Sequence, residues 1–392
     1  MLLTVFSNSG PDGASTITGT AGNFTKGTIS GLSVRQSAAL VLGANKLSLQ
    51  VTGDNPVWTG LDSGNWVLGT TGANGNWKMI TAGTPTDYIA GDTILFDDSV
   101  TTGTTALNIP ANVSPALATF NNSTKDYTVS GVAGIAAGSI IKTGTGKVTF
   151  STANSYNGGT TVSAGTLALA GSGTLGATTG ALTVNGTGIV DFGTTSQTVG
   201  AVSLAGTGTI SNGTITPTSV SATSAGAAVI SASIGGGGSV VQSGSGSLTL
   251  SGANSYTGGT TATAGTLIVS GTGTLGATTG ALNLNGAALD LGTTSQTVGT
   301  VTKSGTGTIS NGTLAFAVFN DTHTVGTGTI SAKLTGSGAL NLTGAGGTLV
   351  LTGANDYTGG TTIHAGVLQI GQLQAKQLIV PISPGGRAIG QQ

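Results

Sequence analysis

The sequence predicts an all-β protein: a parallel β-helix (β-solenoid) preceded by a β-rich, tryptophan-containing segment. Three observations predict this fold. Glycine supplies 71 of the 392 residues and charged residues only 6%, a composition that disfavours long helices. Short alternating apolar runs such as TLALA and ALTV lie between glycine turns, which is typical of strands with one buried face. Near-identical segments also return about a hundred residues apart, which indicates stacked repeats.

Composition excludes several classes of protein. Intrinsic disorder accompanies low hydrophobicity and high net charge, whereas this chain is 37% hydrophobic, with a mean hydropathy of +0.29 and a net charge of −1. No lysine or arginine lies between Lys147 and Lys303, so we expect no nucleic-acid partner. No apolar run approaches the length of a membrane span. The absence of cysteine excludes disulfides and thiolate metal sites.

The first 130 residues divide into two segments. Residues 1–53 alternate strand signals with glycines and are predicted to form an N-terminal β segment or early coils of the solenoid. Residues 54–130 are rich in tryptophan and aspartate, and we predict a β segment that shields the open end of the solenoid, where free strand edges would aggregate. Its tryptophans suit either a sugar-binding platform or a buried core, and the core is the favoured interpretation. They are Trp58, Trp66 and Trp77.

Residues 131–371 are predicted to form the solenoid itself. The nonapeptide ANSYNGGTT at 153–161 returns as ANSYTGGTT at 253–261 and as ANDYTGGTT at 354–362, giving two complete units and a truncated third. At roughly 20–25 residues per coil, one unit is four or five coils. The nonapeptide reads as a coil corner, so its tyrosines should lie in a line along the rod with their hydroxyls outside. They are Tyr156, Tyr256 and Tyr357.

The stretch TGTGKVTFSTANSYNGGTTVSAGTLALAGSGTLG, at 143–176, resembles the autotransporter-associated β-strand repeat of bacterial passenger-type surface proteins. The tryptophan-containing stretch that starts WTGLDSGNW also resembles a segment found beside such repeats. The resemblance implies a parallel β-helix that is exported to the cell surface.

The C-terminal tail, residues 372–392, differs from the repeats because it is rich in glutamine and has no threonine. We predict a tail or cap in which KQLIVPIS is a last strand, stopped by Pro381 and Pro384, or a donor strand for the next subunit. Together with the apolar start MLLTVF, a donor strand would join protomers end to end into a filament.

Candidate catalytic residues are few and scattered. Glycosidases need two carboxylates about 5–10 Å apart, but Asp191 and Asp290 are repeat equivalents, predicted to lie about four coils or near 20 Å apart. The histidines, His323 and His364, have no cysteine partner and no evident serine–aspartate arrangement. We therefore predict no catalytic residue, which makes a polysaccharide-degrading β-helix the less favoured interpretation.

Two motifs suggest ligands but have simpler explanations. GSGTLG at 171–176 and GTGTLG at 271–276 match a dinucleotide-binding glycine pattern, yet no helix is predicted to follow, so we interpret them as turns. GDTILFDDS at 91–99 gathers Asp92, Asp97 and Asp98 near Asp87, but turn capping is favoured over calcium binding. We predict no cofactor-binding residue, no metal ligand and no cofactor.

The sequence thus favours a non-catalytic, extracellular structural or adhesive β-solenoid at a bacterial surface. The alternative is a filament subunit that polymerises through its terminal strands. Self-association and contacts with glycans are the expected partnerships, because the surface should be uncharged and rich in Thr, Ser and Asn. Ice binding is less favoured, since its threonine ladders need a Thr-x-Thr at one place in every coil.

Overall fold

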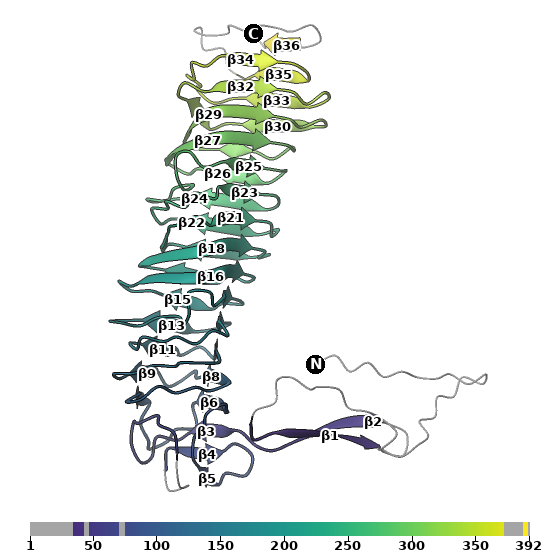
Figure 1. Ribbon diagram of the computed structural model, residues 1–392. Helices are drawn as coiled ribbons and strands as arrows, with labels where there is room; N and C mark the ends of the chain where they lie inside the picture. The colour runs from purple at the N-terminus through teal and green to yellow at the C-terminus, as the bar shows by residue number, and fades with distance from the viewer. Residues whose placement is uncertain (1–33, 43–46, 70–74, 372–386, 391–392) are drawn as a thin grey trace, which may run out of the picture.

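A computed structural model describes residues 34–42, 47–69, 75–371 and 387–390, and within these ranges the chain forms strands and no helix. Figure 1 shows a long rod of stacked coils. The strands of successive coils pair in parallel, as β11 (Lys147–Phe150) does with β13 (Thr166–Leu169). The predicted all-β parallel β-helix is therefore confirmed.

Each coil contributes strands to two parallel sheets, here named sheet I and sheet II. Sheet I contains β6 (Thr93–Asp97), β8 (Leu117–Asn121), β10 (Ser139–Thr143), β12 (Thr160–Val162), β14 (Leu182–Val184), β16 (Ser196–Leu204), β18 (Thr214–Ala222), β20 (Ser233–Ile234), β21 (Ser239–Gln242), β23 (Thr260–Ala262), β25 (Leu282–Leu284), β27 (Ser295–Lys303), β29 (Thr313–Asp321), β31 (Lys333–Thr335), β32 (Ala339–Leu342) and β34 (Thr361–Ile363).

Sheet II is 15-stranded. It contains β7 (Ala106–Asn108), β9 (Tyr127–Ser130), β11, β13, β15 (Ile189–Asp191), β17 (Thr209–Ser211), β19 (Ala227–Ile230), β22 (Ser247–Leu250), β24 (Thr266–Val269), β26 (Ala288–Asp290), β28 (Ile309–Ser310), β30 (Thr327–Ile330), β33 (Thr348–Leu351), β35 (Val367–Ile370) and β36 (Arg387–Gly390).

Alternation of side chains builds the core. In β11, Val148 and Phe150 are buried while Lys147 is exposed, because successive side chains of a strand point to opposite faces. Parallel pairing then stacks Val148 on Leu167 of the next coil and Leu167 on Val190 of the one after. A coil alone cannot bury these side chains, so the continuous column between the two sheets stabilises the rod.

The hundred-residue repeat is five coils. In sheet I the registered partners run from Thr160 through Leu182, Val202, Val220 and Val240 to Thr260. The same walk from Thr260 reaches Thr361 after five further coils. Equivalent residues of successive units therefore lie on one line along the rod axis. The nonapeptide tyrosines, each four residues before one of these threonines, occupy equivalent corners, as predicted.

The prediction that the tyrosine hydroxyls point outside is wrong. Tyr156 and Tyr256 are fully buried, and each hydroxyl lies 2.7 Å or 2.6 Å from the Oγ1 atom of Thr160 or Thr260. Tyr357, in the last unit, keeps the same bond to Thr361 at 2.6 Å but is only partly buried. A threonine that is itself buried forms a hydrogen bond with the hydroxyl, so the tyrosine is buried without leaving an unpaired polar group.

The aromatic cluster at the N-terminal end closes the rod. Strands β3 (Pro56–Trp58), β4 (Trp77–Met79) and β5 (Pro85–Thr86) pair antiparallel, and β3 meets β6 in parallel. The ring of Trp77 lies 5.0 Å from that of Trp58 and 6.3 Å from that of Trp66, both in edge contact. All three tryptophans are buried, which confirms the predicted core and leaves no exposed platform for sugars.

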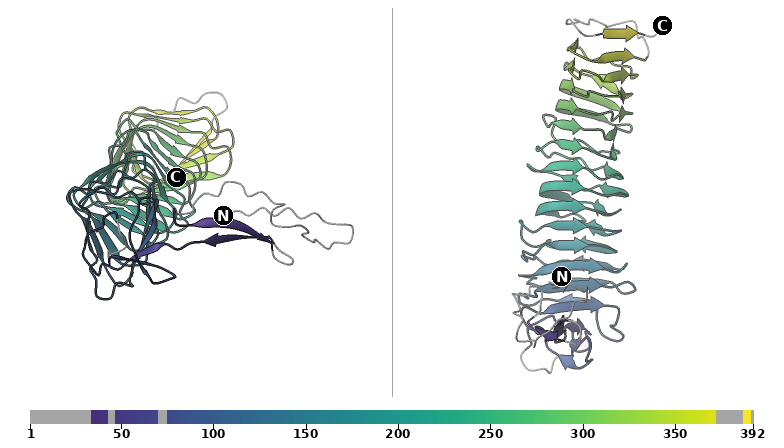
Figure 2. Two further views of the ribbon diagram at one scale, coloured as in Figure 1. Left: turned by 60° about the horizontal axis from the view of Figure 1, so that its bottom comes forward. Right: turned by 90° about the vertical axis from the view of Figure 1, so that its right-hand side faces the viewer.

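Parallel pairing reaches into the tryptophan-containing segment, because β6 already pairs with β8 in the register of later coils. Ahead of it, β1 (Ser37–Leu42) and β2 (Leu47–Thr52) pair antiparallel with each other, and Figure 2 shows this hairpin projecting from the rod. Arg35 holds its base to the cap through Asp92, with Nε 2.7 Å from Oδ1 and an Nη atom 3.1 Å from Oδ2. In the described part of residues 1–53, this hairpin stands in place of early coils.

At the C-terminal end, β36 extends sheet II by pairing in parallel with β35. The last described strand is therefore RAIG at Arg387–Gly390. The predicted strand KQLIVPIS lies outside the described residues, as does the N-terminal stretch MLLTVF.

Replacing Gly176 by alanine should destabilise the rod far more than replacing Gly171. Both glycines have a positive φ, 85° and 55° respectively. A Cβ atom on Gly176 would lie 2.3 Å from the carbonyl oxygen of Tyr156, whereas one on Gly171 meets nothing within 4 Å. We expect Gly171→Ala to cost about 1 kcal/mol of backbone strain and Gly176→Ala about 3 kcal/mol or more, because the buried tyrosine must also move. Chemical denaturation of the two variants measures this difference, and equal losses would contradict it.

Candidate functional site

The two aspartates considered as a catalytic pair lie far apart, and each binds a turn. Asp191 in β15 and Asp290 in β26 are five coils apart rather than the four expected, because each unit holds five coils. That separation is about 24 Å along the axis. Asp191 accepts hydrogen bonds from Asn212 Nδ2 at 2.7 Å and from the Gly193 amide at 2.9 Å. Asp290 repeats both contacts in the next unit, so each carboxylate stabilises a turn.

The glycine pattern GSGTLG is a turn that accommodates a tyrosine. A Cβ atom on Gly176 would lie 2.8 Å from the Tyr156 ring, and one on Gly276 would lie 2.8 Å from the Tyr256 ring. No helix follows either motif in the described chain. The absence of a side chain therefore serves the coil corner in both units.

The aspartates near residue 95 cap backbone amides. Asp98 accepts bonds from the amides of Ser123, Thr124 and Lys125 at 2.9–3.0 Å. Its slight burial raises its pKa, but these amides outweigh that effect and hold the pKa below its usual value. Asp97 accepts the Ser99 amide at 2.9 Å, which is again turn capping. Within the described ranges, no group of three His, Cys, Asp or Glu side chains is placed to hold a metal ion.

The structure's unexpected feature is a set of polar side chains inside the rod. One inward column of sheet I runs through consecutive coils at the end of each strand. Its members are mostly apolar, for example Val162 and Leu204, but four are polar and fully or almost fully buried. These four are Lys142, Gln242, Lys303 and Asp321.

Lys142 and Gln242 occupy the same position in successive units, and both donate hydrogen bonds to backbone carbonyls. Lys142 Nζ donates to the carbonyl of Gly144 at 2.7 Å and also contacts that of Thr143. Gln242 Nε2 donates to the carbonyls of Gly244 at 2.8 Å and Gly246 at 3.2 Å. Both side chains therefore satisfy carbonyls of the corner that follows the strand. The Gln242 amide does so without a charge. Desolvation lowers the pKa of Lys142 to about 8, although nearby aspartates act in the opposite direction.

The other two polar residues form a buried ionic cluster with a histidine. Lys303 and Asp321 are registered partners on β27 and β29, and Lys303 Nζ donates to the carbonyl of Gly305. Asp321 Oδ1 contacts Nδ1 of His323, whose Nε2 lies 3.2 Å from the carbonyl of Thr348. Burial lowers the pKa of Lys303, while Asp321 opposes that shift. The carboxylate thus lies within a small group of buried polar atoms.

The preceding unit shows what this cluster replaces. Residues 99 positions earlier are Leu204, Ala222 and Ser224, all of them buried. An apolar pair and a small hydroxyl thus become a cation, an anion and an imidazole at one place in the rod. Removing the carboxylate alone would leave the buried Lys303 without the anion that opposes its desolvation, which is costly. The three differences between units form one coordinated substitution.

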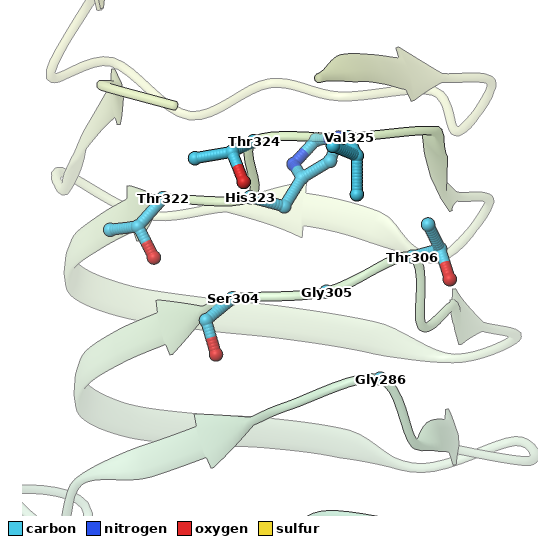
Figure 3. A pocket seen from close by; sticks show the side chains of 8 residues that line it. All are labelled: Gly286, Ser304, Gly305, Thr306, Thr322, His323, Thr324 and Val325. Atoms are coloured by element: carbon cyan, nitrogen blue, oxygen red, sulfur yellow. The ribbon is translucent and has the colours of Figure 1, made fainter. Parts of the chain in front are cut away.

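A shallow groove lies over this cluster. It has a volume of about 360 Å³, and its walls come from three successive coils, as Figure 3 shows. Gly286 and Gly305 lack side chains there, while Ser304 and Thr322 contribute hydroxyls. His323 lines the groove but is 94% buried, and both of its ring nitrogens already contact protein oxygens. The geometry supports a structural role for this histidine.

The outward face of sheet I carries His364, which is exposed. It lies two coils from His323, with its side chain on the outer face while that of His323 is buried, so the two histidines do not share a site. The described residues include no apolar helix of membrane-spanning length.

Comparison with known families identifies the repeat. The passenger-associated-transport-repeat matches residues 140–169, 240–269 and 346–370. The chain carries three passenger-associated transport repeats. The first match spans β11 to β13 and most of β10, so it covers the tyrosine corner between two coils. Together with the solenoid, the repeats fit an autotransporter passenger-type protein, the family that the sequence resembles. Neither a curated protein nor a solved structure matches the chain.

Sequence reasoning missed the buried polar column. Lys142 and Gln242 align when the first two passenger repeats are superposed. Leu342 precedes the third matched segment but holds the same place in the strand register. A lysine equivalent to a leucine is a signal of a buried position. The Lys303 cluster gives a weaker signal, because it lies outside the matched segments. Lys303 becomes a neighbour of Asp321 and His323 only when the coils stack.

Lys142→Gln should remove a pH dependence from the folding stability of the rod. The folded-state pKa of Lys142 is about 8, against an ordinary value of 10.5. The unfolded chain thus binds the proton more tightly, and the stability of the unmodified protein should rise by about 3 kcal/mol as the pH rises from about 8 to 10.5. Because Gln242 makes the same bonds without a charge, the variant should lack this rise. The difference between the two denaturation profiles measures it, and parallel profiles would contradict it.

The ionic cluster should behave as one unit. Asp321→Ala alone leaves Lys303 buried without its carboxylate and should cost about 3 kcal/mol. The triple variant Lys303→Leu, Asp321→Ala, His323→Ser copies the preceding unit and should lie within about 1 kcal/mol of the unmodified protein. Chemical denaturation of the single and triple variants tests this expectation. Costs that simply add across the three sites would show that the residues act independently.

Proposed function

We propose that the chain is a non-catalytic structural and adhesive rod of a bacterial surface protein, presented outside the cell. The observation that carries this proposal is the uninterrupted stack of coils bearing three passenger-associated transport repeats. Passenger-associated repeats imply a secreted or surface passenger domain. A stack of coils supplies length, and its closely hydrogen-bonded ladders resist proteases.

The chemistry of the described residues supports the absence of catalysis. Asp191 and Asp290 cap turns five coils apart, and the Asp321–His323 pair is enclosed. A general acid or base must reach a substrate. Asp191 and Asp290 accept hydrogen bonds from turn amides and from asparagine side chains. Asp321 Oδ1 contacts the ring of His323, and both residues are buried. What the surface offers instead is a long array of short polar side chains, suited to contact rather than to reaction.

The alternative, a filament joined through terminal strands, has less support. End-to-end growth needs a free parallel edge at each end of the rod. At the N-terminal end, the antiparallel strands β3, β4 and β5 and the tryptophan cluster cover the first coils. An incoming parallel strand would have to displace this cap. The rod is therefore the better supported of the two.

Surface presentation is tested on intact cells of the source bacterium. An antibody against residues 131–371 should label unpermeabilised cells in immunogold microscopy, and deletion of that segment should reduce attachment of cells to each other or to surfaces. Purified rods should degrade no glycan. Labelling that needs permeabilisation would contradict the location, and glycan breakdown abolished by Asp191→Asn with Asp290→Asn would contradict the absence of catalysis.

A further inference from the structure

The outward face of sheet I carries two columns of short polar side chains. From β12 to β34, each coil presents one residue from the strand and a second residue two positions later, starting with Thr161 and Ser163. The first column is Thr161, Thr183, Ser203, Ser221, Val241, Thr261, Asn283, Thr302, Asn320, Asn341 and Thr362. The second is Ser163, Asn185, Ala205, Thr223, Ser243, Thr263, Asn285, Ser304, Thr322, Thr343 and His364.

The composition of this two-column face is unusually uniform. Of its 22 positions, 19 are Ser, Thr or Asn, and the exceptions are Val241, Ala205 and His364. None carries an aspartate, glutamate, lysine or arginine. The outward face of sheet II includes Lys147, Asp191 and Asp290. In sheet I, Lys333 of β31 is a charged outward residue that lies outside the two columns. The two columns therefore form a charge-free strip along one side of the rod only.

The spacing of the strip restricts what can bind along its length. Rows recur at about 4.8 Å along the axis, and the two columns are about 7 Å apart. A partner that contacts every row must share this axial period. A second copy of the rod has the same period by construction, so it stays in step over all eleven coils.

The chemistry of the strip is also self-complementary. Hydroxyl and carboxamide groups both donate and accept hydrogen bonds, so two such faces pair without a fixed donor side and acceptor side. Within one rod the face already makes such bonds, with Asn341 Nδ2 donating to Asn320 Oδ1 at 3.0 Å. With no charge on the strip, two copies do not repel each other. Its lack of aromatic rings disfavours sugars, which commonly stack on them.

We infer that the sheet I strip is a lateral docking surface for a second copy of this chain, with the two strips face to face. The inference rests on the proposed adhesive role and names the partner of that role: the same protein on the same or a neighbouring cell. Eleven rows span about 48 Å, and a strip about 12 Å wide gives an area near 600 Å² per copy. The total of about 1,200 Å² is at the lower limit of specific interfaces, so the pair should be reversible.

Charge introduced into the strip tests the inference with the full chain in solution. One variant carries Thr183→Arg, Thr261→Arg and Thr302→Arg; a second carries Asp at the same three positions. The control, Thr249→Arg, lies on the outward face of sheet II in β22. The measurement is sedimentation equilibrium across a concentration series, in low and high salt.

We expect the unmodified rod and the control to dimerise with the same dissociation constant, nearly independent of salt. Each charged variant should dimerise at least tenfold more weakly, because like charges face each other. A mixture of the Arg and Asp variants should recover association that weakens in high salt. This recovery also shows that both variants are folded.

Three results would overturn the inference: an unmodified rod that stays monomeric at every concentration, an equal effect of the control, or no recovery in the mixture. A monomeric rod that shapes growing ice crystals would assign the strip to ice instead. None of these outcomes bears on immunogold labelling of cells, so failure of the docking surface and failure of the surface location are distinguishable.

Discussion

Parallel register between successive coils is the constraint on which the rest of this structure depends. Each strand must present its inward residue directly above the inward residue of the previous coil, because a slip of one residue would turn every apolar side chain outward. The walk from Thr160 to Thr260 keeps this register through five coils although the coils differ in length. Glycine turns absorb the differences at the corners, as Gly176 does where its missing side chain leaves room for the Tyr156 ring.

The same constraint explains where polar groups can enter the core. The buried lysines and the glutamine of sheet I lie towards the end of a strand, next to a corner whose carbonyls accept their hydrogen bonds. A donor placed there replaces water for those carbonyls, whereas the same group in the middle of the core would stay unpaired. Gln242 shows that the role needs only a donor, and Lys142 fills it at the cost of burying a charge.

The register does not constrain the ends or the outer faces of the rod, so the differences in structure and charge between its parts are found there. At the N-terminal end, antiparallel strands and three tryptophans replace the stacked coil, which protects the edge of the first parallel strands. Along the rod, sheet II has charged residues on its outer face, whereas the sheet I strip has none. An outward residue contributes little to stacking, so stacking alone does not require the uniformity of the strip.

The sequence by itself determined the fold class, the repeat and the equivalence of Tyr156, Tyr256 and Tyr357, because alternation and repetition are local patterns that stacking preserves. It also favoured a buried tryptophan cluster, since a charge-poor segment needs large side chains to form a core. Only the tertiary structure decided that the tyrosine hydroxyls lie inside, that a unit is five coils, and that Lys303, Asp321 and His323 meet. Those facts depend on which residues of different coils lie one above another, and coil lengths of about 18 to 22 residues hide that from the sequence.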